Sequence, residues 1–364
     1  MIKNPLSFEV LPMKSMEKIL ENREINSWIR HFSRSPHQIH DPHQADAELI
    51  EIKSDGSHLL AVTIDTISDE ITAGLYHDPF TMGWVTVMSN FSDLAAVGAD
   101  PVGIVTAVSL ELERDEKFRE GLASGIAEAC RQLGVFILGG DINTTRTISL
   151  TGCAIGLVPR NEKMIRVGCQ VGDVVFLSGS AGWGNALGLV RLSTLPEEYF
   201  PEELYRPRAR IKEGQLIRRY ATCCMDTSDG LLITLDQLLR LNSLGFIIEV
   251  DWKKILAEDV YLLCEKTAIP HWFMAGGIHG EFELVFAVPS EKVRSFLQAA
   301  EHIDFYPIQL GVIQQKPELT LALPTGKKAD IDMTPLRNLW ASGGTDLSRL
   351  MQEHYACGRK WGLE

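Results

Sequence analysis

The stretch SNFSDLAAVGADP, residues 89–101, places an aspartate, Asp93, in a run of apolar and small residues. The residues before it continue this run, and Asp78 suits the position that precedes a helix, so we predict a buried helix that ends near residue 97. An ionised carboxylate is costly in such surroundings unless a cation or hydrogen-bond donors compensate its charge. Ser89 and Asn90 lie on the same stripe of the helix as Asp93, which predicts one polar patch that binds such a partner.

The whole chain has the composition of a soluble globular protein, with 364 residues of which 45% are hydrophobic and 23% charged. No apolar run reaches the roughly 18 residues of a membrane span, and the N-terminus lacks the apolar centre of a signal peptide, so we expect no membrane partner and a cytoplasmic location. The net charge of −13 argues against a nucleic-acid-binding protein. The seven cysteines show no spacing typical of zinc sites, and we expect buried free thiols.

Apolar segments rich in β-branched residues alternate with amphipathic segments, which predicts a mixed α/β fold with two halves. The polar segment over residues 160–173 is the expected connection between the halves. We therefore predict an N-terminal extension, two domains and a C-terminal tail, over residues 1–44, 45–160, 161–335 and 336–364. The residues from about 341 onward carry no clear domain signal.

Several apolar strands of the predicted fold end on aspartates. Asp65 ends VTID, Asp141 ends ILGGD, and Asp226 and Asp229 lie in MDTSDG. Because Asp226 and Asp229 are three residues apart, we expect them on one side of an entering helix. Strand ends are where α/β folds gather ligand groups. Carboxylates without matching histidines or cysteines suit a hard cation, magnesium before zinc.

Each of these aspartates taken alone is explained as well by a helix or turn cap. Their common position at the ends of apolar runs is what favours a shared site. The glycines of LGGD, LSGSAGWGNALGL and TSDG offer backbone amides that can approach a phosphate, but neither a Walker loop nor a GxGxxG motif is present. The residues by themselves therefore predict a magnesium- and phosphate-binding site without a defined substrate.

In sequence order, TIDT, NFSDLAAVGADP, ILGGD, RVGCQVGDVVFLSG, MDTSDGLL and HGEFELVFAVP resemble segments of the thiamine-monophosphate kinases, in the superfamily of aminoimidazole ribonucleotide (AIR) synthetase. The resemblance covers roughly residues 44–335. It implies a two-domain AIR-synthetase-like fold, α/β of the α+β type, with an N-terminal domain that forms a homodimer through a shared β-barrel. It also implies that ATP binds in a cleft with magnesium ions and phosphorylates a small phosphorylated metabolite, thiamine monophosphate, to thiamine diphosphate.

The resemblance also implies roles for individual residues, position by position. Asp226 and Asp229 match the catalytic centre. The matches to nucleotide-binding positions are Thr66, Gly140, Arg166 and Ser228. The matches to metal ligands are Asp46, Asp65, Asp93, Asp141, Asp226 and Asp229. Catalysis in such a site rests on positioning and on charge neutralisation by magnesium, without a covalent enzyme intermediate.

The chain departs from the family pattern at four places. The GDD segment is QADAE here, which keeps Asp46 but has Ala45 in place of the other acid. The GGEDYEL segment is IHGEFELVF, in which the acid survives as Glu281 and the tyrosine is Phe282. GGDTTR is GGDINTTR, with two residues inserted before Arg146, and EGxHF has no clean counterpart. The nucleotide half of the site is therefore closer to the family than the acceptor half.

Two other readings stay open. One is another AIR-synthetase-related enzyme that activates a carbonyl or amide oxygen by phosphorylation, such as the cyclo-ligase or the hydrogenase maturation dehydratase. Cys357, seven residues from the C-terminus, matches the terminal cysteine of the dehydratase poorly, and residues 1–60 lack the cysteine that a selenophosphate synthetase needs. The other reading is a nucleotide-binding regulatory or assembly protein without catalysis.

Overall fold

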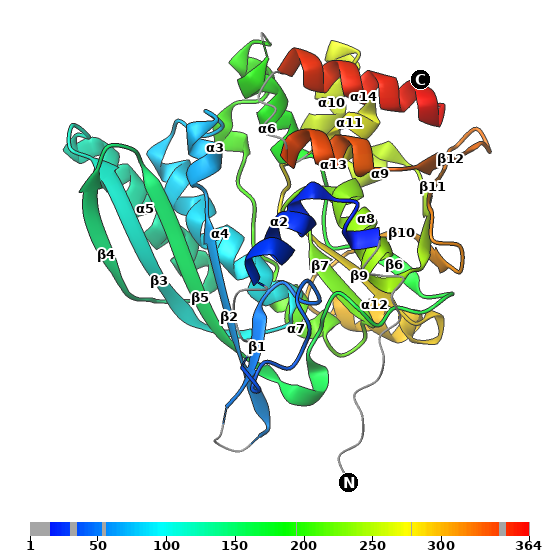
Figure 1. Ribbon diagram of the computed structural model, residues 1–364, viewed down its shortest axis with the longest axis horizontal. Coiled ribbons are helices and arrows are strands. Elements are labelled where there is room, and N and C mark those ends of the chain that lie inside the picture. The colour runs from blue at the N-terminus through cyan, green and yellow to red at the C-terminus, as the bar shows by residue number, and fades with distance from the viewer. Residues whose placement is uncertain are drawn as a thin grey trace.

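The computed structural model describes residues 15–29, 35–52, 56–193, 195–277, 279–341 and 347–363. Two sheets dominate it, one of five strands in the N-terminal half and one of seven strands in the C-terminal half. Figure 1 shows the two sheets side by side, with helix α4 (Pro79–Ala96), which contacts strands of both, between them. The mixed α/β fold with two halves is confirmed.

The five-stranded sheet, sheet A, has the order β1-β2-β5-β3-β4. Its strands are β1 (Glu48–Glu51), β2 (His58–Thr66), β3 (Asp100–Glu111), β4 (Ile137–Thr145) and β5 (Ser149–Pro159). All neighbouring strands are antiparallel except β3 and β4. Helix α5 (Glu116–Leu133) joins these two, as a parallel connection requires.

Helix α4 covers one face of sheet A, and α5 packs against α4. Asp78 caps α4 as the sequence predicts, because its carboxylate accepts the amide hydrogens of Phe80 and Thr81 at 3.2 and 3.1 Å. A Cβ atom at Gly125 of α5 would lie 2.0 Å from the carbonyl oxygen of Phe80, so the two helices touch through their backbones. On its other side, α4 contacts β5 and β2, the strand that carries Thr63 and Asp65.

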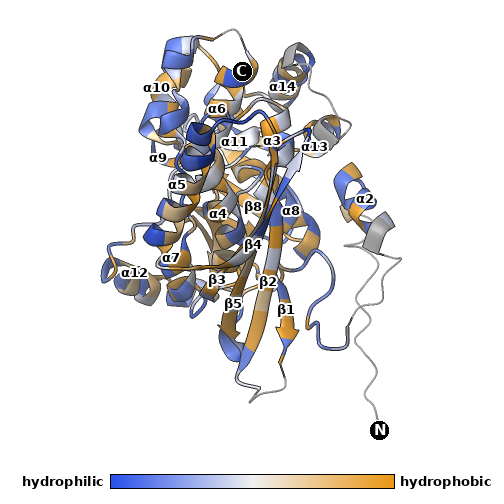
Figure 2. Ribbon diagram, turned by 90° about the vertical axis from the view of Figure 1, so that its left-hand side faces the viewer, coloured by the Kyte–Doolittle hydropathy of each residue, from blue (hydrophilic) through white to orange (hydrophobic). Residues whose placement is uncertain are grey.

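The opposite face of sheet A is open to solvent. Ile64 of β2 is 71% exposed on this face, although it is large and apolar, and the register sets it beside Cys153 of β5, which pairs with Val105 of β3. At the edge of the sheet, Phe136 and Ile142 are each 75% exposed, and Ile142 pairs with Val108 on the other face. Figure 2 views the molecule from the side of this sheet, and hydrophobic residues colour much of its strands. Neither sheet of the described residues closes on itself, so one chain alone does not form the barrel that the resemblance implies.

The seven-stranded sheet, sheet B, has the order β12-β11-β8-β10-β6-β9-β7. Its strands are β6 (Val174–Leu177), β7 (Cys223–Asp226), β8 (Gly245–Glu249), β9 (Leu284–Val288), β10 (Ile308–Gln314), β11 (Leu319–Ala322) and β12 (Lys328–Ile331). Only β8 and β11 pair in parallel. Strand β7 lies at the edge of the sheet and contacts α4, and its last residue, Asp226, accepts from Ser92 of α4.

The C-terminal half also contains most of the helices. They are α6 (Trp183–Leu192), α7 (Ile211–Ile217), α8 (Leu231–Asn242), α9 (Trp252–Ile255), α10 (Glu258–Thr267), α11 (His271–Gly276), α12 (Val293–Glu301), α13 (Thr334–Ala341) and α14 (Leu347–Trp361). The tail without a clear sequence signal thus forms a helix, α14, because its buried Leu350, Cys357 and Trp361 lie on one helical face. Among the described residues, no helix is both long and apolar enough to cross a membrane.

Both ends of the described chain pack on α8. Helix α2 (Leu20–Ile29) meets α13 through Asn338, whose side chain accepts from the amide of Leu20 at 2.8 Å. Beneath them, Asp236 of α8 accepts from Arg240 and Arg337 at 2.8 and 2.9 Å. We call α2, α8 and α13 together the terminal clasp. Within it, α2 and α13 contact α8, the helix that follows the turn after Asp226.

Candidate functional site

Three carboxylates from three separate elements meet between the two halves. Asp46 precedes β1, Asp93 lies in α4, and Asp226 ends β7, and one oxygen of each lies within 4.8 Å of the others. Each carboxylate is held from one side. Thr63 donates to Asp93 at 2.5 Å, Ser92 to Asp226 at 2.6 Å, and Arg166 to Asp46 at 2.7 Å. We call the three aspartates the acidic cluster.

The acidic cluster retains acceptor atoms that the described protein does not satisfy. Asp46 Oδ2 and Asp226 Oδ1 are buried and have no hydrogen-bond partner. Burial, followed by the charges of Asp226 and Asp46, raises the pKa of Asp93 well above its usual value. Burial and the charge of Asp46 raise the pKa of Asp226 to about 7. Crowded, unpaired carboxyl oxygens of this kind are what a bound cation would stabilise.

Among the described residues, Arg166 is the only basic residue that forms an ion pair with the acidic cluster. Burial alone would lower its pKa, but the charge of Asp46 and the hydrogen bond to it raise the pKa above its usual value. The Nε–H group of Arg166 is buried without a partner. The guanidinium group therefore keeps a donor that can meet a phosphate oxygen.

The polar residues of α4 around Asp93 also form hydrogen bonds with the neighbouring strand, β2. Asn90 accepts from the amide of Asp65 at 3.1 Å. Burial is the main cause that raises the pKa of Asp65, while the hydrogen bond from the Thr66 amide opposes it. Four polar residues from α4 and β2 are therefore in contact or adjacent, as expected for one polar patch.

Asp229 lies in the turn between β7 and α8, which begins at Leu231. The expectation that Asp226 and Asp229 share one side of a helix is therefore wrong, because the helix starts after both. Burial and the charge of Glu21 raise the pKa of Asp229 to about 7. Ser228, beside it, accepts from the amide of Gly280 through its backbone oxygen at 2.9 Å, which fixes the turn.

Asp141 and Gly140 lie apart from the acidic cluster within one chain. The register sets Asp141 opposite Ala107, a residue of the open face of sheet A. Three strand spacings separate β4 from β2, or about 14 Å. Asp141 accepts from Asn143 at 2.6 Å, and Thr66 on β2 donates to the backbone oxygen of Leu150 at 3.0 Å. The structure thus brings Asp46, Asp93 and Asp226 together but not Asp141.

Two buried carboxyl groups were missed by sequence reasoning. Glu70 of the short helix α3 (Ser68–Thr72) has a buried Oε2 without a partner, and burial, then the charges of Asp65, Asp69 and Asp229, raise its pKa to about 7. In the sequence, the only feature that pointed to Glu70 was its position five residues after Asp65, the acid near the end of β2. Glu281 was noted only as the surviving acid of a changed motif.

Glu281 connects α6 with the turn of Asp226. It accepts from the Gly182 amide at 2.7 Å and from Thr227 at 3.0 Å. Burial raises its pKa to about 8. Beside it, His279 bonds the hydroxyl of Tyr76 from the N-terminal half at 2.8 Å. This network fixes the loop over residues 279–283 against the acidic cluster.

The donor set of the acidic cluster fits magnesium and a polyphosphate. All three clustered ligands are carboxylates, two of their oxygens are unsatisfied, and no histidine or thiol belongs to the described group. Oxygen-only ligands favour magnesium over zinc. Ala45, the departure noted above, packs against the hydrophobic core and brings no further ligand.

Residues 44–158 match the family model described as "AIR synthase related protein, N-terminal domain". The chain is 31% identical over 249 residues to a thiamine-monophosphate kinase from Archaeoglobus fulgidus, covering 67% of this chain and 78% of that protein. It is 30% identical over 281 residues to the Pyrococcus horikoshii thiamine-monophosphate kinase, covering 76% and 85%. Both matches cover two thirds of this chain or more.

Solved structures of other proteins share this fold. The solved structure described as AaThiL complexed with AMPPCP and TMP superposes with a TM-score of 0.68 at 22% identity, covering 85% of this chain and 94% of that one. At this identity the likeness concerns the fold alone, and it confirms the AIR-synthetase-like architecture that the sequence predicts.

Proposed function

Since the chain belongs to the thiamine-monophosphate kinase family, we propose that it transfers the γ-phosphoryl group of ATP to the phosphate of thiamine monophosphate, forming thiamine diphosphate and ADP. The observation that carries this proposal is the acidic cluster with Arg166 at its edge. Unsatisfied carboxylate oxygens beside a guanidinium group suit a polyphosphate bound with its divalent cation.

Asp46, Asp93 and Asp226 would hold magnesium, which when bound neutralises charge on the phosphates and aligns them for in-line transfer. The protein's own part is positioning. Thr63 and Ser92 each donate to one carboxylate and so fix its second oxygen toward the gap between the halves. Arg166 would offer its unpartnered Nε–H to a phosphate oxygen.

The other predicted site residues have supporting roles in this proposal. Asp65 and Asp229 would act as further metal ligands or hold metal-bound water, supported by their buried, partly satisfied carboxyl groups. Thr66 and Ser228 stand next to them in sequence and would contact the nucleotide. Asp229 together with Asp226 would form the catalytic centre, because both end the strand and turn that face α4.

We further propose that the protein is a homodimer that covers the open face of sheet A. The exposed Ile64 on that face supports this, because large apolar side chains that gather on an open sheet face commonly mark an interaction site. Asp141 and Gly140 lie on β4 in the same sheet. Their predicted roles at the nucleotide would then depend on the second copy.

An ADP-release assay with magnesium, ATP and thiamine monophosphate tests the reaction. Asp93→Asn and Asp226→Asn should each lower turnover by at least 100-fold, an order of magnitude typical for lost charge stabilisation of phosphoryl transfer. Asp259→Asn is the control, because Asp259 is exposed on α10. Full activity of both cluster variants would show that the aspartates are structural caps.

A nucleotide-binding function without catalysis is the second candidate, and Ala45 favours it. An acid of the family pattern is absent there, and the alanine packs against the core instead. Calorimetry with magnesium and ATP, followed by the same assay, separates the two candidates. Tight binding without ADP formation from any acceptor, including carbonyl and amide metabolites, would support the second candidate and reject transfer.

A further inference from the structure

Arg240 and Arg337 share one buried carboxylate in the terminal clasp. Arg240 of α8 donates to Asp236 through Nε at 2.8 Å and through Nη2 at 2.9 Å, so this pair alone occupies both carboxylate oxygens. Arg337 of α13 adds a third donor, Nη1, at 2.9 Å. Two guanidinium groups on one carboxylate leave an excess of positive charge in a buried place, where an uncompensated charge is costly.

The excess charge belongs to Arg337 rather than to Arg240. All three side-chain nitrogens of Arg240 donate within the clasp, because Nη2 also reaches Thr334 at 2.8 Å and Nη1 reaches the backbone oxygen of Ser15 at 3.1 Å. Among the described residues, the guanidinium group of Arg337 donates one hydrogen bond, although its side chain is only 5% exposed. Its other ion pair, with Glu21 of α2, spans 3.7 Å, and the Glu21 side chain is 54% exposed. An ion pair with so exposed a partner compensates the charge weakly.

The charge of Arg337 acts on Asp229, the candidate catalytic residue. Asp236, which anchors Arg337, lies in the second turn of α8, the helix that follows Asp229. After burial, the charge of Glu21 raises the pKa of Asp229 and the charge of Arg337 lowers it, and the effect of Arg337 exceeds that of Arg166. Because Coulomb interactions weaken with distance, a second arginine thus lies within range of the candidate site.

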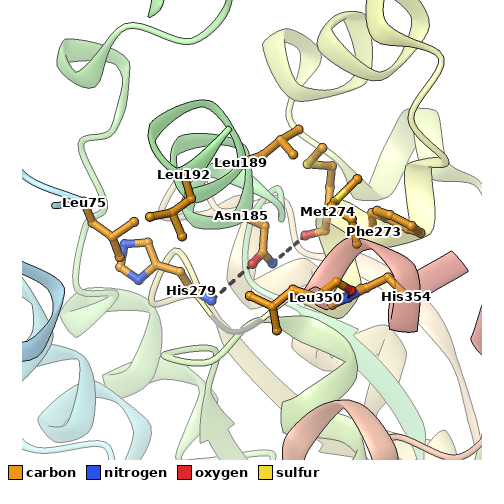
Figure 3. Close-up of a pocket in the computed structure, with 12 residues that line it drawn as sticks. Leu75, Asn185, Leu189, Leu192, Phe273, Met274, His279, Leu350 and His354 are labelled. Atoms are coloured by element: carbon orange, nitrogen blue, oxygen red, sulfur yellow. Dashed lines mark hydrogen bonds between the residues drawn. The ribbon is translucent and has the colours of Figure 1, made fainter. Parts of the chain in front are cut away.

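A phosphate group has no comparable partner in the apolar cavity of the C-terminal half. Figure 3 shows this cavity, which is lined by Leu189, Leu192, Met274 and Leu350, among others. The described lining includes neither lysine nor arginine, and burial lowers the pKa of both its histidines, His279 and His354. An anion is therefore better stabilised at the candidate site, where Arg166 and Arg337 supply positive charge.

We propose that Arg337 is a second phosphate-binding residue, which donates through its guanidinium group to a terminal phosphate in the candidate site. The phosphate belongs either to ATP or to the acceptor monophosphate, since both end in the same kind of group. A planar guanidinium group matches two phosphate oxygens, and the hydrogen bond to Asp236 restricts its orientation. The role of Arg337 rests on the proposed function, because that function supplies the phosphates.

Isothermal titration calorimetry on the full chain tests this role without any transfer step. One ligand is the ATP analogue AMPPCP with magnesium, and the other is thiamine monophosphate. Arg337→Gln should raise one of the two Kd values by roughly 10–100-fold, because it removes a charged hydrogen bond to phosphate. A higher Kd for AMPPCP assigns the phosphate to ATP, and a higher Kd for thiamine monophosphate assigns it to the acceptor.

Arg240→Gln is the matched control, because it removes the other guanidinium group from the same carboxylate. It should lower Tm at least as much as Arg337→Gln and leave both Kd values nearly unchanged. Arg337→Gln leaves both hydrogen bonds between Arg240 and Asp236 in place, so we expect it to fold. Arg337→Lys keeps the charge without the planar fork and should show a smaller loss of the same affinity, which keeps the test decisive if Arg337→Gln does not fold.

Chemical rescue separates a contact with phosphate from a role in holding the clasp. Guanidinium chloride at a low, non-denaturing concentration should restore part of the lost affinity to Arg337→Ala, and sodium chloride should not. Two unchanged Kd values in Arg337→Gln, or equal losses in Arg337→Gln and Arg240→Gln, would overturn the role of Arg337. A wild type that binds AMPPCP but not thiamine monophosphate rejects the proposed acceptor, and the Kd for AMPPCP alone then decides on Arg337. A wild type that binds neither ligand overturns both.

Discussion

Neutralising one carboxylate of the acidic cluster should stabilise the protein without metal and remove its stabilisation by metal. The pKa of Asp226 is raised to about 7 from 3.8. The folded chain therefore holds this proton more tightly than the unfolded chain, and stability falls as the pH rises from about 4 to about 7. At about 1.4 kcal/mol per unit, the ionised carboxylate costs at most about 4 kcal/mol above pH 7.

Asp226→Asn removes this cost while the amide oxygen still accepts from Ser92. Asp93 titrates with Asp226, so part of the cost is shared, and we expect a gain of about 2–4 kcal/mol at about pH 8. At about 2 °C per kcal/mol for a chain of this size, Tm should rise by about 4–8 °C in EDTA. Magnesium at about 10 to 100 times its Kd should add about 1.4–2.7 kcal/mol to the wild type and nothing to the variant.

Differential scanning calorimetry with EDTA or with magnesium measures both effects. Asp259→Asn, an exposed control, should behave like the wild type in both conditions. The reasoning is refuted if Asp226→Asn melts at or below the wild-type temperature in EDTA, or if magnesium raises Tm equally in both. Either result would mean that the carboxylates do not repel one another or do not hold the metal.

Three further predictions follow from other groups. Burial raises the pKa of Glu281 to about 8, so the folded chain is destabilised as this carboxyl group ionises. Between about pH 5 and pH 8, the wild type should lose about 2–4 kcal/mol of unfolding free energy relative to Glu281→Gln, measured by urea unfolding. A difference between the two proteins that does not change with pH would contradict this. Glu202→Ala should destabilise the fold by about 2–4 kcal/mol in the same assay, because Glu202 accepts from Arg191 and from the amides of His77 and Asp78, and Arg191 keeps only Glu197 as an ion-pair partner; a loss below about 1 kcal/mol would refute this role of Glu202. Ile64→Lys should halve the mass found by light scattering, because it puts a charge on the open face of sheet A, whereas Leu262→Lys on the exposed surface of α10 should leave the mass unchanged; a dimer mass for Ile64→Lys would refute an interface on this face.

The local features of the site could be predicted from the sequence because they depend on helical period and on caps. Asp78 caps α4 as expected, and Asn90 and Asp93 reach the same strand because they are three residues apart on one helix. The family resemblance added Asp46 and Arg166. Their ion pair spans 120 residues, and no local pattern contains it.

What the sequence could not give depends on register and on tertiary packing. Asp141 ends an apolar segment just as Asp65 does, but the side to which a strand residue points depends on its position relative to its neighbours, and a slip of one residue reverses it. The turn that holds Asp229 was read as a helix because α8 begins only two residues later. Glu70 carried no motif, since its importance comes from burial beside other acids.

The terminal clasp makes the order of synthesis matter for folding. Asp236 bonds Arg337, which follows it by 101 residues, and Gln237 bonds Asn22, which precedes it by 215. At a synthesis rate of ~5–20 residues per second, about 5–20 s pass between the synthesis of Asp236 and that of Arg337, its second arginine partner. During that time Asp236 has only Arg240, four residues later in the chain, as an arginine partner. The N-terminal half, complete more than 150 residues earlier by the position of β5, can fold first and offer α4 as the surface on which β7 and α8 assemble.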